Sequence, residues 1–288
     1  MTAIIAARPA RARRSPRARH GASLLTLLAW AVGLMFFAPA AWMVLTSLHT
    51  ESAAATNPPS LGAPLTLRGY QEFFGGGQSA WPPLINSATA SVLSTVLVLL
   101  LAIPAAYALS IKPVRKARDV LFFFLSTKML PVVAGLLPIY LVAQRLGVLD
   151  NINFLVLLYA SMNLPIAVWM MRSFLAEVPV EVLEAAAIDG ANLFTVMRRV
   201  IVPLTSPGIA ATALICFIFS WNELLFARVL TGVVAGTAPV FLTGFVTSQG
   251  LFLAKVCAAA VAISLPVLAA GFAAQDKLVQ GLSLGAVK

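Results

Sequence analysis

The sequence predicts an all-α integral membrane protein with six transmembrane helices, on the basis of three observations. Of the 288 residues, 60% are hydrophobic and only 10% charged, whereas soluble domains are about 45–50% apolar and about 25% charged. Six apolar runs reach the length of about 20 residues that a helix needs to cross a bilayer. Basic residues gather at alternate ends of these runs, which is how membrane proteins fix their orientation.

The six runs and their flanks divide the chain into three parts. Helices are expected at residues 23–47, 84–110, 120–143, 153–172, 206–230 and 253–274. Membrane helices tolerate prolines because neighbouring groups or water satisfy the freed carbonyls, and several of these runs contain them: Pro104, Pro131, Pro138, Pro165 and Pro266. A transmembrane domain at 23–274 is thus expected between a basic tail at 1–22 and a short tail at 275–288.

Lys and Arg residues are divided unevenly between the two sides of this domain. With a cytoplasmic N-terminus, fifteen of the twenty lie in inner segments, and only Arg68 and Arg145 lie in outer loops. Both termini are therefore predicted in the cytoplasm. This distribution also explains the net charge of +10 without nucleic acid, which is not an expected partner. Six basic residues and no acid occupy the first twenty positions: Arg8, Arg11, Arg13, Arg14, Arg17 and Arg19.

The N-terminus has two other interpretations. The triplet at 38–40 is similar to a signal-peptidase site, but the apolar run is longer than the core of a signal peptide and continues to Leu45. Organellar transit peptides are also Arg-rich and acid-poor, and the first twenty residues alone fit one. A cytoplasmic basic flank explains these residues more simply.

The segment at about 48–83 is predicted to be the longest outer loop. It contains Asn57-Pro58-Pro59, Gly75-Gly76-Gly77 and Trp81-Pro82-Pro83, which exclude a long regular helix. A short amphipathic helix is expected at about Leu67–Phe74.

Motifs of catalysis are missing from the sequence. It contains no GxxxxGK[ST] phosphate loop and no HExxH, and its two histidines, His20 and His49, lie outside the apolar runs. We therefore expect no enzyme activity, no bound cofactor and no metal site in this chain.

A long polar stretch at about 173–205 separates two strongly apolar runs on the predicted inner side. Pro179 suits the start of a helix, and Glu181 and Glu184 are favoured in its early turns. Gly190 allows a sharp turn, after which a second short helix is expected at Leu193–Val200, with Leu193, Val196, Met197 and Val200 on one face. The two interpretations are a docking element for a partner and an amphipathic loop lying on lipid headgroups.

This loop resembles that of the permease subunits of bacterial ATP-binding-cassette (ABC) importers. Their loop reads EAA, three residues, Gly, nine residues and I-x-L-P, and here it reads Glu184-Ala185-Ala186, Gly190 and Val200-Ile201-Val202-Pro203. Val thus replaces the usual Ile and Leu. The triplet Asp189-Gly190-Ala191 is similar to the carbohydrate-importing subgroup, in particular to the second permease of maltose-type systems. Other segments also fit that subgroup: 104–109, 163–165, 169–174, 219–223 and 278–282. Residues 126–131 are similar to permeases for sorbitol and mannitol.

The resemblance implies a type I ABC importer permease fold in the bacterial inner membrane and a set of partners. These are an ABC ATPase dimer that uses ATP and Mg²⁺, a second homologous permease, a periplasmic solute-binding protein, a sugar or sugar alcohol as substrate, and membrane lipid. The loop would be the coupling helix that seats on the ATPase, with these residues involved: Glu184, Ala185, Ala186, Asp189, Gly190, Ala191 and Pro203.

Charged residues inside the predicted runs suggest where substrate passes. A charge at the bilayer centre costs at least about 2.5–3.5 kcal/mol, so it usually faces water or a partner. Lys128 and Glu223 lie seven or more residues from the predicted edges of their runs, and we expect both near the translocation path. Asn222 would bind substrate hydroxyls and Trp221 could stack on a sugar face. The alternative is a structural ion pair between helices.

Two other function classes remain open from the sequence. An ion-coupled secondary transporter would need intramembrane carboxylates and inverted repeats, and only Glu223 is a candidate acid. A membrane receptor or assembly scaffold would use the loop only to dock a protein.

Overall fold

The computed structural model describes residues 16–56, 62–76, 79–111, 114–247 and 250–286, and these are mostly helical. Some predicted features lie wholly or partly outside these residues: the N-terminal tail up to Arg14, Asn57–Pro59, Gly77, Lys112 and Lys288. The one departure from an all-helical fold in the described part is a two-stranded hairpin, β1 (Val246–Thr247) with β2 (Gly250–Leu251).

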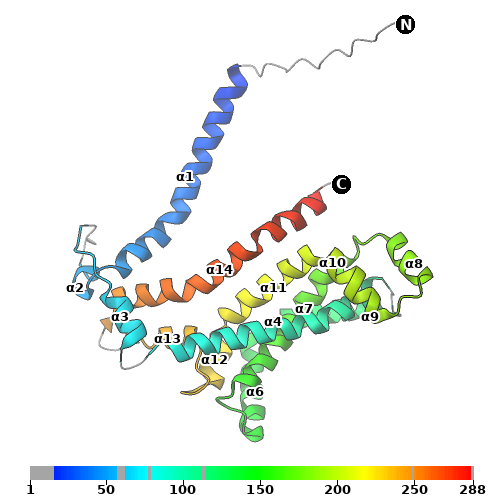
Figure 1. Cartoon of the computed structure of the whole chain (residues 1–288). Helices are drawn as coiled ribbons and strands as arrows, with labels where there is room; N and C mark the ends of the chain where they lie inside the picture. The colour runs from blue at the N-terminus through cyan, green and yellow to red at the C-terminus, as the bar shows by residue number, and fades with distance from the viewer. Residues whose placement is uncertain (1–15, 57–61, 77–78, 112–113, 248–249, 287–288) are drawn as a thin grey trace.

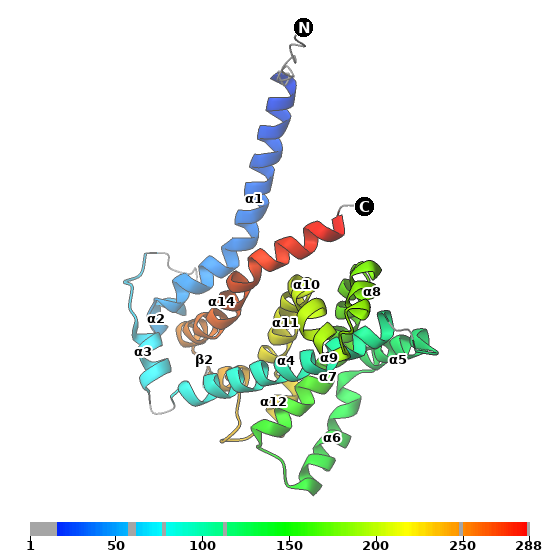
Figure 2. The same ribbon diagram turned by 45° about the vertical axis from the view of Figure 1, so that its right-hand side comes forward.

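Four long apolar helices confirm four of the six predicted runs. They are α1 (Pro16–Ser47), α4 (Trp81–Ser110), α7 (Ile152–Leu175) and α14 (Leu253–Ala286). Figures 1 and 2 show α4, α7 and α11 (Ser206–Trp221) side by side, with α14 beside α11. In both views α1 leans away from this bundle, and its residues 25–40 are exposed.

The run predicted at 120–143 is not one helix. It consists of α5 (Ala117–Met129) and α6 (Val132–Leu146), which meet at an angle of 89°. The cause is Pro131, which lacks a backbone N–H and forces the residue before it out of helical geometry. Leu130 accordingly has φ −68° and ψ 135°.

The run predicted at 206–230 is also interrupted. Helix α11 ends at Trp221, and α12 (Leu225–Leu230) begins after a three-residue break. At its other end, α11 makes an angle of 81° with the segment Leu193–Leu204. By length and composition the described residues contain four helices that could cross a membrane, or up to six if each bent pair is one span.

The core of the bundle combines small residues with hydrogen bonds between helices. Ser94 of α4 donates to the hydroxyl of Ser220 of α11 at 3.0 Å, and Asn163 of α7 donates to the same oxygen at 2.9 Å. At the start of α11, a Cβ on Gly208 would lie 2.3 Å from the ring of Phe174, so only glycine fits there. Such contacts hold membrane helices together because lipid provides no hydrophobic drive for their association.

Short elements gather at the two ends of the bundle (Figure 1). The α3 end carries α2 (Glu51–Ala54), α3 (Arg68–Gly75), α13 (Ala238–Thr243), the hairpin, and the loops at 147–151 and 231–237. Helix α3 confirms the short helix predicted near 67–74. The α8 end carries α8 (Val180–Ile188), α9 (Leu193–Val196), the π-helix η1 (Met197–Ile201) and α10 (Val202–Leu204).

Candidate functional site

The polar loop at the α8 end contains a sharp turn centred on Gly190. Helix α8 follows Pro179, as predicted, and Gly190 has φ +71°, in the left-handed region that favours glycine. The N–H of Ala191 bonds back to the carbonyl of Ala186 at 3.0 Å and closes the end of the helix. The backbone conformation at this turn therefore favours the glycine of the loop motif.

The second segment of the loop differs from the predicted regular helix at Leu193–Val200. Asn192 caps α9 by accepting the N–H of Thr195 at 2.9 Å, but the chain changes after Val196 into the π-helix η1. Val196 is buried and Met197 and Val200 pack against the core, as predicted, whereas Leu193 is 59% exposed. Isolated π-turns are frequent at functional sites.

The predicted coupling residues form a surface of short side chains. Glu184, Ala185, Asp189, Gly190 and Pro203 are exposed. Ala186 and Ala191 are partly buried and fix the loop to the core of the bundle. Two large apolar side chains flank this surface, Ile188 at 87% and Phe194 at 72% exposure. A small-residue surface with apolar projections suits docking against another protein.

Charged side chains of this loop have no ion-pair partner within the described part of the chain. The two ion pairs found there join Glu72 to Arg68 and to Lys255, at the opposite end. The unpaired residues of the loop, all of them exposed, are Glu177, Glu181, Glu184, Asp189, Arg198 and Arg199. These charges are free to meet a partner.

Three of the four predicted pathway residues lie together where α11 ends. Trp221 is buried and its Nε1 donates to the carbonyl of Ile263 at 3.1 Å. Asn222 is exposed, and its amide donates to the carbonyl of Ile218 at 2.9 Å. Both therefore make contacts to the backbone of their own bundle.

Glu223 has a structural role that the sequence did not predict. Its carboxylate accepts the N–H groups of Phe226 at 2.9 Å and Ala227 at 3.0 Å, which caps α12, and the hydroxyl of Tyr159 of α7 at 3.0 Å. The cap explains why the apolar run is interrupted here. Glu223 thus lies in a break between helices, and the prediction that it lies deep within one continuous span is wrong.

Lys128 lies apart from this group. It is exposed in the last turn of α5, next to the bend at Pro131, and so it too lies at a break and far from the middle of a helix. The alternative of a structural ion pair with Glu223 is wrong for this structure, because no ion pair of the described residues includes either side chain.

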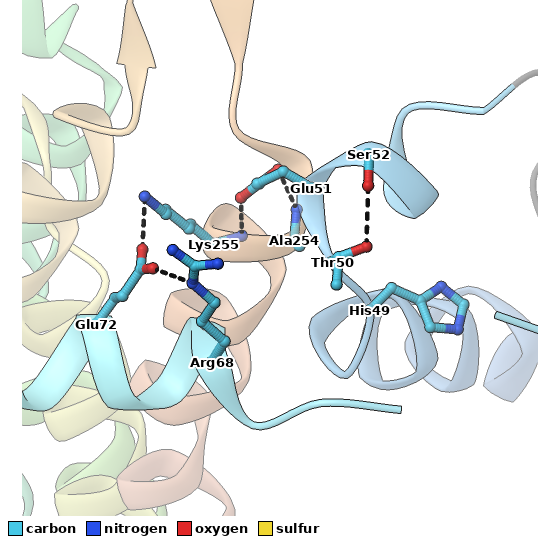
Figure 3. A pocket seen from close by; sticks show the side chains of 9 residues that line it. His49, Thr50, Glu51, Ser52, Arg68, Glu72, Ala254 and Lys255 are labelled. Atoms are coloured by element: carbon cyan, nitrogen blue, oxygen red, sulfur yellow. Dashed lines mark hydrogen bonds and ion pairs between the residues drawn. The ribbon is translucent and has the colours of Figure 1, made fainter. Parts of the chain in front are cut away.

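A cluster of charged residues at the α3 end was missed by the sequence analysis. Figure 3 shows Glu72 of α3 directed toward Arg68 and Lys255, at 2.8 and 2.6 Å, while His49 points away from them. Bonds from Lys255 and from Arg68 hold the pKa of Glu72 below its usual value. Glu51 accepts the N–H groups of Ala254 and Lys255 and so caps α14.

Asp150, which was also missed, organises a neighbouring loop. Its carboxylate accepts the N–H groups of Gly232 at 2.8 Å, Val234 at 3.0 Å and Ala235 at 2.7 Å. Partial burial acts to raise the pKa of Asp150, but the backbone donors outweigh it and hold the pKa below its usual value. Asn86 binds the same loop through the carbonyls of Val234 and Gly236. Asp150 and Asn86 lie far along the chain from the loop residues that they bind, so no local pattern in the sequence indicates these contacts.

Known proteins similar to this chain are found by sequence and by structure. Residues 98–283 match the family model described as "Binding-protein-dependent transport system inner membrane component". A probable ABC transporter permease, y4oR of Sinorhizobium fredii, is 38% identical over 277 residues, covering 95% of this chain and 99% of that protein. The trehalose transport system permease SugB of Mycobacterium tuberculosis is 32% identical over 275 residues, covering 94% and 98%.

A solved structure supports the fold. The crystal structure of a bacterial ABC transporter that imports the acidic polysaccharide alginate contains a chain that superposes with a TM-score of 0.75. The match covers 93% of this chain and 100% of that chain, at 23% sequence identity.

Proposed function

The chain belongs to the family of inner membrane components of binding-protein-dependent transport systems, the permease subunits of ABC importers, and from this we propose how it works as one. As a permease for sugars it is an integral inner-membrane protein and is not itself an ATPase. The relative named for trehalose, which matches along nearly its whole length, supports a sugar substrate. A sugar alcohol substrate is supported only by the resemblance of residues 126–131, which extend from α5 across the bend into α6.

The proposed topology has six spans with both termini in the cytoplasm. The four long helices supply four of them, and the bent pair α5–α6 and the interrupted segment α11–α12 supply the other two. The positive-inside bias then places the α8 end in the cytoplasm and the α3 end in the periplasm. The domain limits keep the positions expected from the sequence, with tails at 1–22 and 275–288.

The α8 end is the proposed coupling site for the ATPase. The observation that carries this proposal is the exposed turn at Gly190, which is flanked by Glu184 and Asp189 with no partner inside the described chain. Movement of α8 would be passed to α11 through η1 and α10, which lead directly into it. ATP and Mg²⁺ would bind the ATPase dimer, with no cofactor held by this chain.

The remaining partners follow from the importer family. A second permease would complete the translocation path, and a periplasmic solute-binding protein would deliver the sugar at the α3 end. We retain Lys128, Trp221, Asn222 and Glu223 as proposed pathway residues, supported by the exposure of Lys128 and Asn222 at breaks between helices. Neither the fold nor the relatives favour an ion-coupled transporter working alone.

Uptake by cells with a bulky residue at the turn tests the coupling proposal. Gly190→Trp should abolish uptake of labelled disaccharide while the second permease is still co-purified, and the ATPase should be lost or uncoupled. Gly147→Trp is the matched control, because Gly147 has φ +66° and open space around it, as Gly190 does, but lies at the other end. Normal uptake by Gly190→Trp would overturn the proposal, and labelled sorbitol and mannitol in parallel assays test the substrate class.

A further inference from the structure

Behind the coupling loop lies a cavity of about 540 Å³. It is partly open, and its lining residues come from the last turns of α4 and α7 and from α8 and α9. The polar and charged residues that line it are Tyr107, Ser110, Arg172 and Glu184. The rest of the wall is mainly aliphatic, with Leu175, Val178 and Leu183 among its side chains.

Arg172 is the unusual member of this wall. It lies in the last turn of α7 and is partly buried, and its Nε has no solvent contact and no hydrogen-bond acceptor. No ion pair of Arg172 occurs within the described residues, which include all ten acids of the chain. A partly desolvated guanidinium with no counter-charge is unfavourable, so an anion in the cavity would stabilise it.

The chemistry of the wall favours a phosphate over a simple carboxylate. Guanidinium groups bind phosphate oxygens with two parallel hydrogen bonds, and the two hydroxyls can donate to the oxygens that remain. The aliphatic residues would lie against an apolar portion of the same ligand. Glu184 is exposed and carries the same sign of charge as a phosphate, which favours a ligand whose anionic group lies toward Arg172 and away from α8.

The position of the cavity indicates the source of the phosphate. Tyr107 and Arg172 lie near the ends of two long apolar helices, the level at which aromatic and basic residues meet lipid headgroups. With the orientation given by the proposed function, this is the cytoplasmic leaflet, where basic pockets between helices bind anionic lipids. We propose that this cavity binds the phosphate of an anionic phospholipid headgroup through Arg172.

Native mass spectrometry of the purified full-length chain tests this site without any assay of transport. The probes are phosphatidylglycerol and, as the zwitterionic comparison that carries a phosphate but no net charge, phosphatidylcholine. Arg172→Gln should weaken phosphatidylglycerol binding about tenfold, because it removes charge-assisted hydrogen bonds. Arg118→Gln is the matched control, since Arg118 is exposed in the first turn of α5 and does not line the cavity. Arg172→Lys keeps the charge but loses the two parallel hydrogen bonds, so its phosphatidylglycerol affinity should lie between those of wild type and Arg172→Gln, a graded effect that a purely structural role of Arg172 would not predict.

Each outcome decides the proposal. Selective loss of phosphatidylglycerol in Arg172→Gln supports it, and glycerol 3-phosphate that competes at low concentration would instead identify a soluble phosphate as the source. Equal lipid retention by wild type, Arg172→Gln and Arg118→Gln would overturn it. The proposal would also be overturned if Arg172→Gln bound lipid as the wild type does but lost the ATPase from the assembled complex. Arg172 would then be expected to pair with a carboxylate of a partner protein. Because the lipid is measured on the chain alone, failure of this site is distinguishable from failure of the importer assignment.

Discussion

The two ends of the bundle differ in whether their acidic side chains have binding partners within the chain. At the α3 end, Glu51, Glu72 and Asp150 all bind groups that come from other elements of the chain. At the α8 end, Glu184 and Asp189 are exposed and have no ion-pair partner among the described residues. Acidic side chains thus stabilise the fold at the α3 end, whereas at the α8 end they are free to bind another molecule.

This difference indicates which end uses its charged residues to fix its own shape. The loop at 231–237 has its backbone held by Asp150 on one side and by Asn86 on the other, so its shape is set within the chain. The loop at the α8 end is held by the helix cap of Asn192, the turn at Gly190 and the packing of its apolar face. Substitutions of charged residues should therefore lower stability at the α3 end and impair coupling at the α8 end.

The largest expected contrast is between two aspartates. Asp150→Asn keeps the side-chain size and suits the left-handed backbone at φ +54°, but it removes the charge from the acceptor of three N–H groups and leaves only one acceptor oxygen. We expect a loss of about 2 kcal/mol, because hydrogen bonds to charged groups contribute about 1.5–3 kcal/mol. Thermal unfolding of the purified chain in detergent measures it.

The matched variant is Asp189→Asn, at an exposed side chain without an ion pair. Its melting temperature should equal that of the wild type, while sugar uptake should fall if the loop docks on the ATPase. Equal destabilisation by both variants would remove the contrast between the two ends.

A smaller effect is expected at the start of α14. Glu51→Gln retains one acceptor but loses the charge that caps two N–H groups at 3.1 and 2.9 Å. The expected loss is about 1 kcal/mol, in the range measured for helix caps. Glu181→Gln is the comparison, since Glu181 lies in the first turn of α8, is exposed and forms no ion pair. A larger loss in Glu181→Gln than in Glu51→Gln, by thermal unfolding, would contradict the comparison.

The sequence predicted the features of the fold that depend on local composition. Apolar length located the four long helices, and the proline at 179 and the glycine at 190 located the start of α8 and the turn that follows it. The helix breaks were harder. Prolines occur both inside continuous helices, as Pro165 in α7, and at a sharp bend, as Pro131, and packing decides between these outcomes.

The charged residues were predictable only where they form a local motif. Glu184 and Asp189 belong to such a motif, whereas Asp150 binds residues more than 80 positions away and Glu51 binds residues more than 200 away. Glu223 was singled out because it interrupts an apolar run, but the break between α11 and α12 and the bonds of Glu223 to Tyr159 and the α12 backbone were not foreseen. Long-range partners of single side chains need the three-dimensional structure.

The smallest expected effect is a dependence of stability on pH that comes from the α3 end alone. The pKa of Glu72 is lowered in the folded chain by Lys255 and then by Arg68, from an ordinary value of 4.5. A carboxyl of lowered pKa stabilises the fold fully above its ordinary pKa, and the contribution is lost as the pH falls through the folded value. Melting temperature should therefore decline below about pH 4.5, and Glu72→Gln should flatten part of that decline. The effect is small because both partners are about one-third exposed and water screens the pair. A Glu72→Gln variant whose melting temperature follows the wild-type profile at every pH would contradict this prediction, and would mean that the ion pairs of Glu72 do not stabilise the α3 end.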